Sequence, residues 1–326
     1  MTTSPVLFLV FSRPKPTARV FEAIRAAKPP RLYVSADGPR ADRPDEAARC
    51  EEVRRITTQV DWPCEVKTLF RERNLGCKMG VAGGITWFFE NEKEGIILED
   101  DCLPHATFFP YCDELLERYR DDTRVMSIAA TNIQGPDLPT PFSYYHSKFS
   151  LMWGWATWRR AWKLYDISMA SWPDVRRTRW LYSIGNNSWL FASIWGEILD
   201  RAHRGEVDTW DYQWIYTCWR EHGLTIVPAT NLVRNLGYGD DATHTASHQR
   251  LLSKLVAQEM RLPLAHPTQI ELIHEADQFI AKYWFGVSRT AYVKQLLLRY
   301  RIVRRSNIMR KKALKVLSLL QGGSAE

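Results

Sequence analysis

The chain has 326 residues and a formal net charge of +7, with 45% hydrophobic and 25% charged residues. This composition is ordinary for a globular protein and excludes disordered, collagen-like and low-complexity chains. No apolar run approaches the roughly 20 residues that span a bilayer, and the run at residues 6–11 is too short for a signal peptide, so we expect a cytoplasmic protein.

The first 130 residues alternate short apolar runs with segments of helical spacing. The pattern predicts strands over 6–11, 31–36, 64–70, 95–98 and 125–130, and helices over 17–28, 45–60, 81–92 and 107–119. Such alternation is typical of an α/β fold in which helices flank a mainly parallel sheet. No GxGxxG and no GxxxxGK[ST] motif is present, which argues against dinucleotide-binding oxidoreductases and P-loop NTPases.

The pattern changes at Tyr144, where a dense aromatic stretch begins. Eleven of the 14 tryptophans lie between Trp153 and Trp219. Beyond this stretch we predict helices over 188–203, 211–221 and 270–282, a strand over 224–228, and a long loop over 231–248. A loop of this length with glycines is a candidate lid over a bound ligand.

The positive charge is concentrated near the C-terminus. Arg289–Lys315 holds ten Lys and Arg residues and no acid, whereas the rest of the chain carries 34 bases and 37 acids. We predict a long helix over 290–320 whose basic, amphipathic surface (289–320) binds an anionic membrane rather than nucleic acid. The alternative is a helix packed on the body with a solvated basic face.

The six cysteines are scattered, which favours buried apolar roles over a disulfide framework or a zinc site.

Polar residues follow the predicted strands at the points where ligands bind in open α/β sheets. They are Ser12-Arg13, Asp37, Asn74–Lys78, Glu99-Asp100-Asp101 and Asn132. Three adjacent carboxylates repel one another unless a cation or hydrogen-bond donors compensate, and oxygen ligands suit Mn²⁺ or Mg²⁺ better than zinc. The rim therefore suits a phosphorylated ligand with a divalent cation, although the acidic trio could also be a solvated turn before a helix.

Four segments also occur in a recognisable order. They are ILEDDCLPHATFFPYCDELL, the Gly154-Trp155 pair, the Trp210-Asp211 pair and residues 227–245. Together, over about residues 5–248, they resemble bacterial GT-A-type nucleotide-diphospho-sugar glycosyltransferases similar to N-acetylglucosaminyltransferase I. The resemblance implies a Rossmann-like GT-A domain with a nucleotide-sugar-binding half (1–135) and an acceptor-side, Trp-rich half with the catalytic base (136–250). A helical C-terminal extension (251–326) follows.

The resemblance assigns roles to the acidic trio and the late segments. It implies that Asp101 coordinates Mn²⁺ or Mg²⁺, that Asp100 contacts the ribose, and that Glu99 contacts the donor sugar. Asp211 becomes the general base, with Asp208 as the alternative. His244 is a candidate metal or phosphate ligand, although a solvated loop histidine is the simpler interpretation.

Further contacts are expected around the nucleotide and the sugar. Ser12, Arg13, Asp37 and Lys78 are the predicted nucleotide contacts, with helix capping, a turn or a solvated surface as their structural alternatives. Most tryptophans are expected in the core, and we predict that two of them form a platform for a sugar ring, with Trp155 and Trp210 the best candidates. Tyr212 stands where the related enzyme has a second acid.

The implied activity is transfer of a sugar from a nucleotide-diphospho-sugar to a glycan or lipid-linked acceptor hydroxyl, with inversion. UDP is the favoured nucleotide, with GDP and dTDP open. Two other classes remain. A sugar-phosphate nucleotidylyltransferase carries a glycine-rich loop where this chain has Ser12–Pro16. A catalytically inactive, carbohydrate-binding, membrane-associated protein would keep the Trp-rich half without needing the acidic trio. The basic tail places the protein in the cytoplasm or on the inner face of the membrane.

Overall fold

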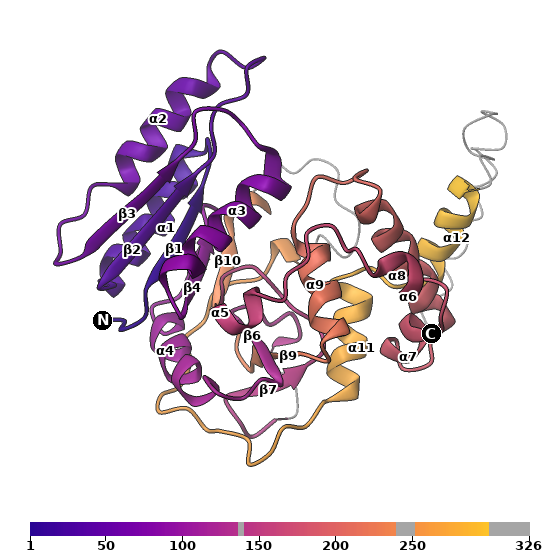
Figure 1. Cartoon of the computed structure of the whole chain (residues 1–326). Helices are drawn as coiled ribbons and strands as arrows, with labels where there is room; N and C mark the ends of the chain where they lie inside the picture. Colours follow the sequence, from indigo (N-terminus) through magenta and orange to yellow (C-terminus); the bar gives the residue numbers. More distant parts are fainter. Residues whose placement is uncertain (136–139, 239–251, 300–326) are drawn as a thin grey trace.

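The structure is a computed structural model that describes residues 1–135, 140–238 and 252–299. A mixed eight-stranded sheet runs through it in the order β3-β2-β1-β4-β8-β6-β9-β7 (Figure 1). Its strands are β1 (Val6–Val10), β2 (Arg31–Ala36), β3 (Glu65–Phe70), β4 (Glu94–Glu99), β6 (Val125–Ala129), β7 (Tyr144–Ser147), β8 (Trp155–Trp158) and β9 (Leu224–Pro228).

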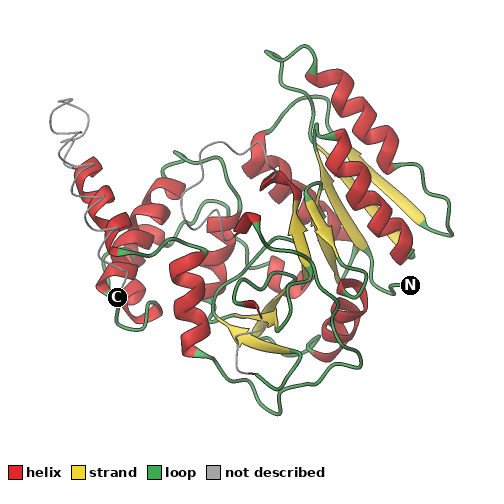
Figure 2. Cartoon of the chain, turned by 180° about the vertical axis from the view of Figure 1, so that it is seen from behind, coloured by secondary structure: helices red, strands yellow, loops and turns green. Residues whose placement is uncertain are grey.

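Six of these strands run in the same direction. The pairs β1–β2, β1–β4, β2–β3 and β6–β9 are parallel, whereas β8 runs antiparallel to β4 and β6, and β7 runs antiparallel to β9. Helices cover both faces of the sheet (Figure 2). The predicted α/β class, with a mainly parallel sheet flanked by helices, is confirmed.

The helices of the first half are α1 (Pro14–Ala27), α2 (Glu46–Thr57), α3 (Gly76–Asn91) and α4 (Phe108–Arg118). Alternate side chains of β1 explain the layers, because successive residues of a strand point to opposite faces. Val6, Phe8 and Val10 pack in the cluster that contains α1 and α4, and Leu7 and Leu9 pack in the cluster that contains α3. Both faces of the strand are therefore buried, as its uninterrupted apolar sequence predicts.

The second half is mainly helical. It contains α5 (Arg159–Trp162), α6 (Trp172–Val175), α7 (Trp180–Ile184), α8 (Trp189–His203), α9 (Asp211–Arg220), α11 (His274–Tyr283) and α12 (Arg289–Arg299). The predicted helices 188–203 and 211–221 and the strand 224–228 match α8, α9 and β9 closely. The predicted helix 270–282 begins later, at His274, and the predicted helix 81–92 begins earlier, at Gly76.

Four strands lie in segments where the sequence predicted none: β7 and β8 in the aromatic stretch, and two shorter ones. β5 (Cys102–Pro104) pairs antiparallel with β10 (Val233–Asn235), so the start of the predicted loop 231–248 is a strand followed by the 3₁₀ turn η2 (Leu236–Tyr238). The rest of that loop, including the predicted lid, lies outside the described residues. β8 arises in the aromatic stretch and fills the gap between β4 and β6 through the pairs Ile97–Trp155 and Ala129–Trp155.

The described part of the C-terminal extension is anchored to the body. Ile280 of α11 is fully buried, and the rings of Trp284 and Phe285 lie 4.5 Å from Trp153 and 4.8 Å from Trp195. The Nε2 group of Gln295 in α12 donates to a backbone carbonyl of α8 at 3.3 Å. α12 therefore contacts the body at this point, and residues 300–320 lie outside the described residues. No helix in the described ranges is both long and apolar enough to cross a membrane.

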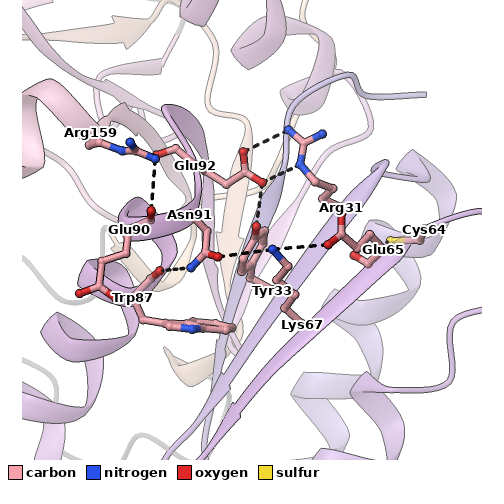
Figure 3. Close-up of polar contacts among 10 residues, drawn as sticks. All are labelled: Arg31, Tyr33, Cys64, Glu65, Lys67, Trp87, Glu90, Asn91, Glu92 and Arg159. Atoms are coloured by element: carbon pink, nitrogen blue, oxygen red, sulfur yellow. Dashed lines mark hydrogen bonds and ion pairs between the residues drawn. The ribbon is translucent and has the colours of Figure 1, made fainter.

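A partly buried ion pair holds the C-terminal end of α3 on the sheet (Figure 3). The carboxylate of Glu92, just after α3, accepts bonds from Arg31 Nε at 2.6 Å and from Tyr33 Oη at 2.8 Å. The Nε group of Arg159 donates to the Glu92 carbonyl at 2.8 Å, which satisfies a backbone acceptor beyond the helix end. With this end fixed on β2 and α5, the opposite end of α3 is positioned at the carboxyl edge of the sheet.

Candidate active site

A pocket of about 330 Å³ opens at the carboxyl ends of β1, β2 and β4. This volume lies within the range of small-molecule sites, at the place where open α/β sheets bind ligands. It is lined by Leu9, Val10, Phe11, Arg13, Ser35, Asp37, Arg40, Asn74, Gly76, Cys77, Gly80, Val81, Glu99, Asp100 and Asp208. Of the predicted nucleotide-sugar contacts, Arg13, Asp37, Glu99 and Asp100 line this pocket, whereas Ser12 and Lys78 adjoin residues that line it.

Arg13 neutralises part of the acidic trio. Its guanidinium forms an ion pair with Asp100 and another with Asp101, the latter at 3.1 Å between Nη1 and Oδ2. Burial would lower the pKa of Arg13, but the charges and hydrogen bonds of the two carboxylates raise it. The guanidinium, which emerges directly after β1, is thus a donor that relieves repulsion within the trio, and nearly half of its side chain stays exposed to meet a ligand.

Glu99 is the most strongly perturbed carboxyl group of the trio. Burial, followed by the charges of Asp101 and Asp100, raises its pKa to about 8. Burial likewise raises the pKa of Asp100, although Arg13 opposes the shift. A carboxyl group with such a pKa in a pocket is a marker of functional sites. Near neutral pH it carries a proton and can donate a hydrogen bond.

Asp37 ends β2 and holds the start of α3. Its carboxylate accepts the backbone N–H of Leu75 at 3.0 and 3.1 Å and that of Gly38 at 3.0 Å. Burial raises the pKa of Asp37 in spite of these bonds. Gly80 lets the helix approach, because a Cβ there would lie 3.1 Å from Asp37 Oδ2. Asp37 therefore both holds the turn through backbone hydrogen bonds and lies in the pocket wall.

Asp211 is the first residue of α9 and lies near the trio. Its carboxylate accepts hydrogen bonds from the hydroxyl of Thr209 and from the backbone N–H of Tyr212, the latter at 2.9 Å. Burial raises the pKa of Asp211, and its charge contributes to the raised pKa of Glu99. This arrangement places a half-buried carboxylate from the second half of the chain close to the acidic trio of the first half.

Asp208, the alternative base, is engaged differently. Its exposed carboxylate accepts the backbone N–H groups of Cys77 and Lys78, each at 2.9 Å. These are orphan donors in the first turn of α3, so Asp208 caps a helix that is remote in sequence. Gly76 has φ +81°, and a Cβ there would lie 2.6 Å from Asp208 Oδ2, so glycine is required at this turn.

The predicted sugar platform is wrong for Trp155 and Trp210. Their exposed fractions are 1% and 3%, and the two rings stack on each other with centroids 5.7 Å apart and an interplanar angle of 20°. Neither indole presents a free face to a ligand. The two rings instead pack β8 against the N-terminal end of α9, where Asp211 is the first residue.

The described residues contain no group of three or more His, Cys, Asp or Glu side chains arranged to hold a metal ion. Mg²⁺ in phosphate-binding sites takes one or two carboxylates and completes its shell with phosphate and water, so Asp101 fits such an ion without further protein ligands. The backbone approaches Asp101 closely at η2, where a Cβ on Gly237 would lie 2.8 Å from its Oδ2. His244 lies outside the described residues.

Sequence reasoning missed Arg71. It comes directly after β3, contacts Ser35 Oγ at 3.3 Å, and has a pKa that burial lowers while Asp37 raises it. The rule that selected Arg13, a basic residue at the end of a parallel strand, also applies to Arg71 and could have identified it. Arg40 has no comparable signal, because its position at the pocket depends on the path of the chain after β2. Ser35 lies within β2, where nothing in the sequence distinguishes it from its neighbours.

Comparisons with known proteins give matches among solved structures. One is HddC from Yersinia pseudotuberculosis, with 12% identity, 44% of this chain and 60% of that chain covered, and a TM-score of 0.27. A UDP-glucose pyrophosphorylase complexed with UDP-glucose has 9% identity, covers 49% and 70%, and has a TM-score of 0.26. Mouse xyloside xylosyltransferase 1 in its apo form has 12% identity, covers 67% and 81%, and has a TM-score of 0.30.

The match with HddC spans less than two thirds of that chain. No family model and no curated protein matches the sequence.

Proposed function

We propose that this chain is a metal-dependent glycosyltransferase that moves a sugar from a nucleotide-diphospho-sugar to a hydroxyl group of a glycan or lipid-linked acceptor. A UDP-sugar is the favoured donor. One observation carries the proposal: the pocket at the carboxyl edge of the sheet gathers Arg13, Asp37, Glu99 and Asp100. Asp101 is paired with Arg13, and Asp211 approaches Glu99 from the other half of the chain.

Each side chain has a task that follows from its chemistry. Arg13, half-exposed beside the trio, binds and orients the diphosphate through charge-assisted hydrogen bonds. A divalent cation held at Asp101 supplies electrostatic stabilisation of the leaving diphosphate. Protonated Glu99 donates a hydrogen bond to a hydroxyl of the donor sugar, and Asp100, in this assignment, contacts the ribose while Arg13 holds it in place.

Asp211 acts as the general base. Its half-buried carboxylate accepts the proton of the acceptor hydroxyl as that oxygen attacks the anomeric carbon. A dedicated base implies direct displacement and inversion at that carbon. The raised pKa of Asp211 fits this role, because a base is most effective when its pKa approaches the working pH. The capping of α3 by Asp208 leaves Asp211 as the residue available for proton transfer.

The connection after β1 supports the proposal over a nucleotidylyltransferase. Three residues, Phe11–Arg13, join β1 to α1, and the following Pro14 and Pro16 are helical. This leaves no room for a glycine-rich phosphate loop. The cytoplasmic or inner-membrane location and the lipid-linked acceptor also belong to the proposal, because the basic segment 300–320 lies beyond the described residues.

The test is incubation of the protein with UDP-, GDP- and dTDP-sugars and Mn²⁺, with release of the nucleotide diphosphate as the measurement. We expect release from one donor, its loss with EDTA, and its loss in Asp211→Asn. A parallel reaction with nucleoside triphosphate and sugar 1-phosphate scores pyrophosphate. Pyrophosphate release would identify a nucleotidylyltransferase, and inactivity in both reactions with retained glycan binding would identify an inactive carbohydrate-binding protein.

A further inference from the structure

One tryptophan differs from all the others in its exposure. Trp189 exposes 63% of its surface, whereas the other thirteen tryptophans are buried or half-buried. A large aromatic side chain in water forgoes the favourable free energy of burial, so an exposed indole that is held in place beside another aromatic ring and an arginine is a candidate contact residue. Trp189 is the first residue of α8 and does not line the pocket.

The position of this indole is fixed by its neighbours. The ring of Tyr182 lies 4.6 Å from that of Trp189, and the guanidinium of Arg179 lies over the indole at 5.9 Å. The hydroxyl of Ser188 accepts the N–H of Phe191 at 3.2 Å and caps α8. The preceding turn is held by a bond of 2.8 Å from Lys148 Nζ to Asn186 Oδ1. Trp189 is therefore presented on an ordered surface.

The surrounding helices are basic. Residues 171–190 and 286–299, which include α6, α7 and α12, contain six basic side chains and one acid. One of the six, Arg176, forms an ion pair with Asp200 at 3.0 Å. α12 contacts α8 through Gln295 and Ser193, one helical turn from Trp189. These helices lie at the end of the molecule opposite β3 (Figure 1). We call Arg179, Tyr182, Trp189 and α12 the aromatic–basic surface.

We infer that the aromatic–basic surface docks on an anionic phospholipid membrane. Trp and Tyr rings prefer the boundary between headgroups and acyl chains, where their apolar bodies are buried and their polar edges stay hydrated. Neighbouring Lys and Arg residues add electrostatic attraction to anionic headgroups. A second copy of this chain is a poor occupant, because a two-fold interface would place the same basic helices against each other. The inference assigns a surface to the proposed membrane location and does not depend on the proposed sugar transfer.

The experiment is sedimentation of the full-length chain with vesicles of phosphatidylcholine alone or with 30% phosphatidylglycerol (roughly the anionic content that attracts polybasic segments). We expect binding to the anionic vesicles at low salt and much less at high salt. Trp189→Ala should weaken binding about tenfold, which corresponds to the transfer of part of an indole from the membrane to water. Trp189→Phe should restore most of it. Val66 is an exposed apolar residue on β3, so Val66→Ala is the matched control and should bind the vesicles as the wild type does.

Three outcomes would overturn the inference. These are wild-type binding by Trp189→Ala, equal binding to neutral and anionic vesicles, and self-association of the wild type that Trp189→Ala abolishes in analytical ultracentrifugation. Loss of binding in the double variant Arg177→Gln/Arg179→Gln supports the electrostatic part separately. Circular dichroism and nucleotide binding of each variant check folding, so failure of the proposed function would leave the vesicle result interpretable.

Discussion

The Oδ2 atom of Asp208 lies 2.9 Å from the backbone nitrogen of Cys77, a contact between residues 131 positions apart. Through this contact the segment that carries Asp211 holds the first turn of α3, which forms part of the pocket wall. Asp208 therefore connects the two halves of the candidate site, and in the proposed function donor binding and proton transfer would both depend on this connection.

Asp208→Ala should affect both functions without removing either. Loss of the cap is expected to lower the free energy of unfolding by about 0.5–2 kcal/mol and to raise the KM for the donor, because the α3 turn is no longer held. Asp208→Asn, which keeps an acceptor, should restore most of the stability. Thermal unfolding and donor-concentration kinetics measure the two effects. A rate loss in Asp208→Asn as large as that in Asp211→Asn would instead identify Asp208 as the base.

Asp211→Asn should leave donor affinity near that of the wild type and slow sugar transfer by about 10²–10⁴-fold. The wild-type rate should fall in acid as Asp211 becomes protonated, with a midpoint above the ordinary Asp pKa of 3.8, because burial raises the pKa of this carboxyl group. The residual activity of Asp211→Asn should lack this acidic limb. Rate measurements across pH check this expectation, and an unchanged limb in the variant would contradict the assignment.

Asp101→Ala should abolish the Mn²⁺ dependence of nucleotide-diphosphate binding while the fold survives, because the residue lies just beyond the end of β4. Titration calorimetry with and without Mn²⁺ is the measurement. Asp42 is an exposed acid before α2, so Asp42→Ala is the control for a general change in charge. If Asp101→Ala keeps a full response to Mn²⁺, the predicted metal ligand is wrong.

Glu99→Gln should stabilise the metal-free protein at alkaline pH. The folded pKa of about 8 lies above the ordinary value of 4.5, so the folded state retains a proton that the unfolded state releases. Stability is therefore lost as pH rises between these two values, and the glutamine, which cannot ionise, avoids this loss. We expect the Tm of Glu99→Gln to exceed that of the wild type at pH 9 and to approach it at pH 4. Equal Tm values at pH 9 would contradict the raised pKa.

Truncation after Arg299 should leave thermal stability and nucleotide binding unchanged and reduce binding to anionic vesicles. Truncation after Ser288 should in addition lower the Tm, because it removes α12 and its contact with Ser193. Differential scanning calorimetry and vesicle sedimentation of the two proteins separate the effects. A large loss of stability after the shorter truncation would show that residues 300–326 also pack on the body.

The sequence alone determined the parallel part of the sheet and much of the pocket rim. Continuous apolar runs such as Val6–Val10 mark strands buried on both faces, and the residues that follow such strands meet at one edge, so Arg13, Asp37 and Glu99 could be placed together from their order in the chain. These are local signals, since each depends on a strand and the residue after it.

Only the tertiary structure decided the roles that depend on distant partners. The indoles of Trp155 and Trp210 became a buried stack because β8 inserts antiparallel between β4 and β6, a pairing that no local pattern in an aromatic stretch specifies. Asp208 became a cap for a helix 131 residues away, and Trp189 remained exposed in a segment whose other tryptophans are buried or half-buried. Burial and hydrogen bonding between remote segments depend on how the halves pack, and residue type and spacing do not encode that packing locally.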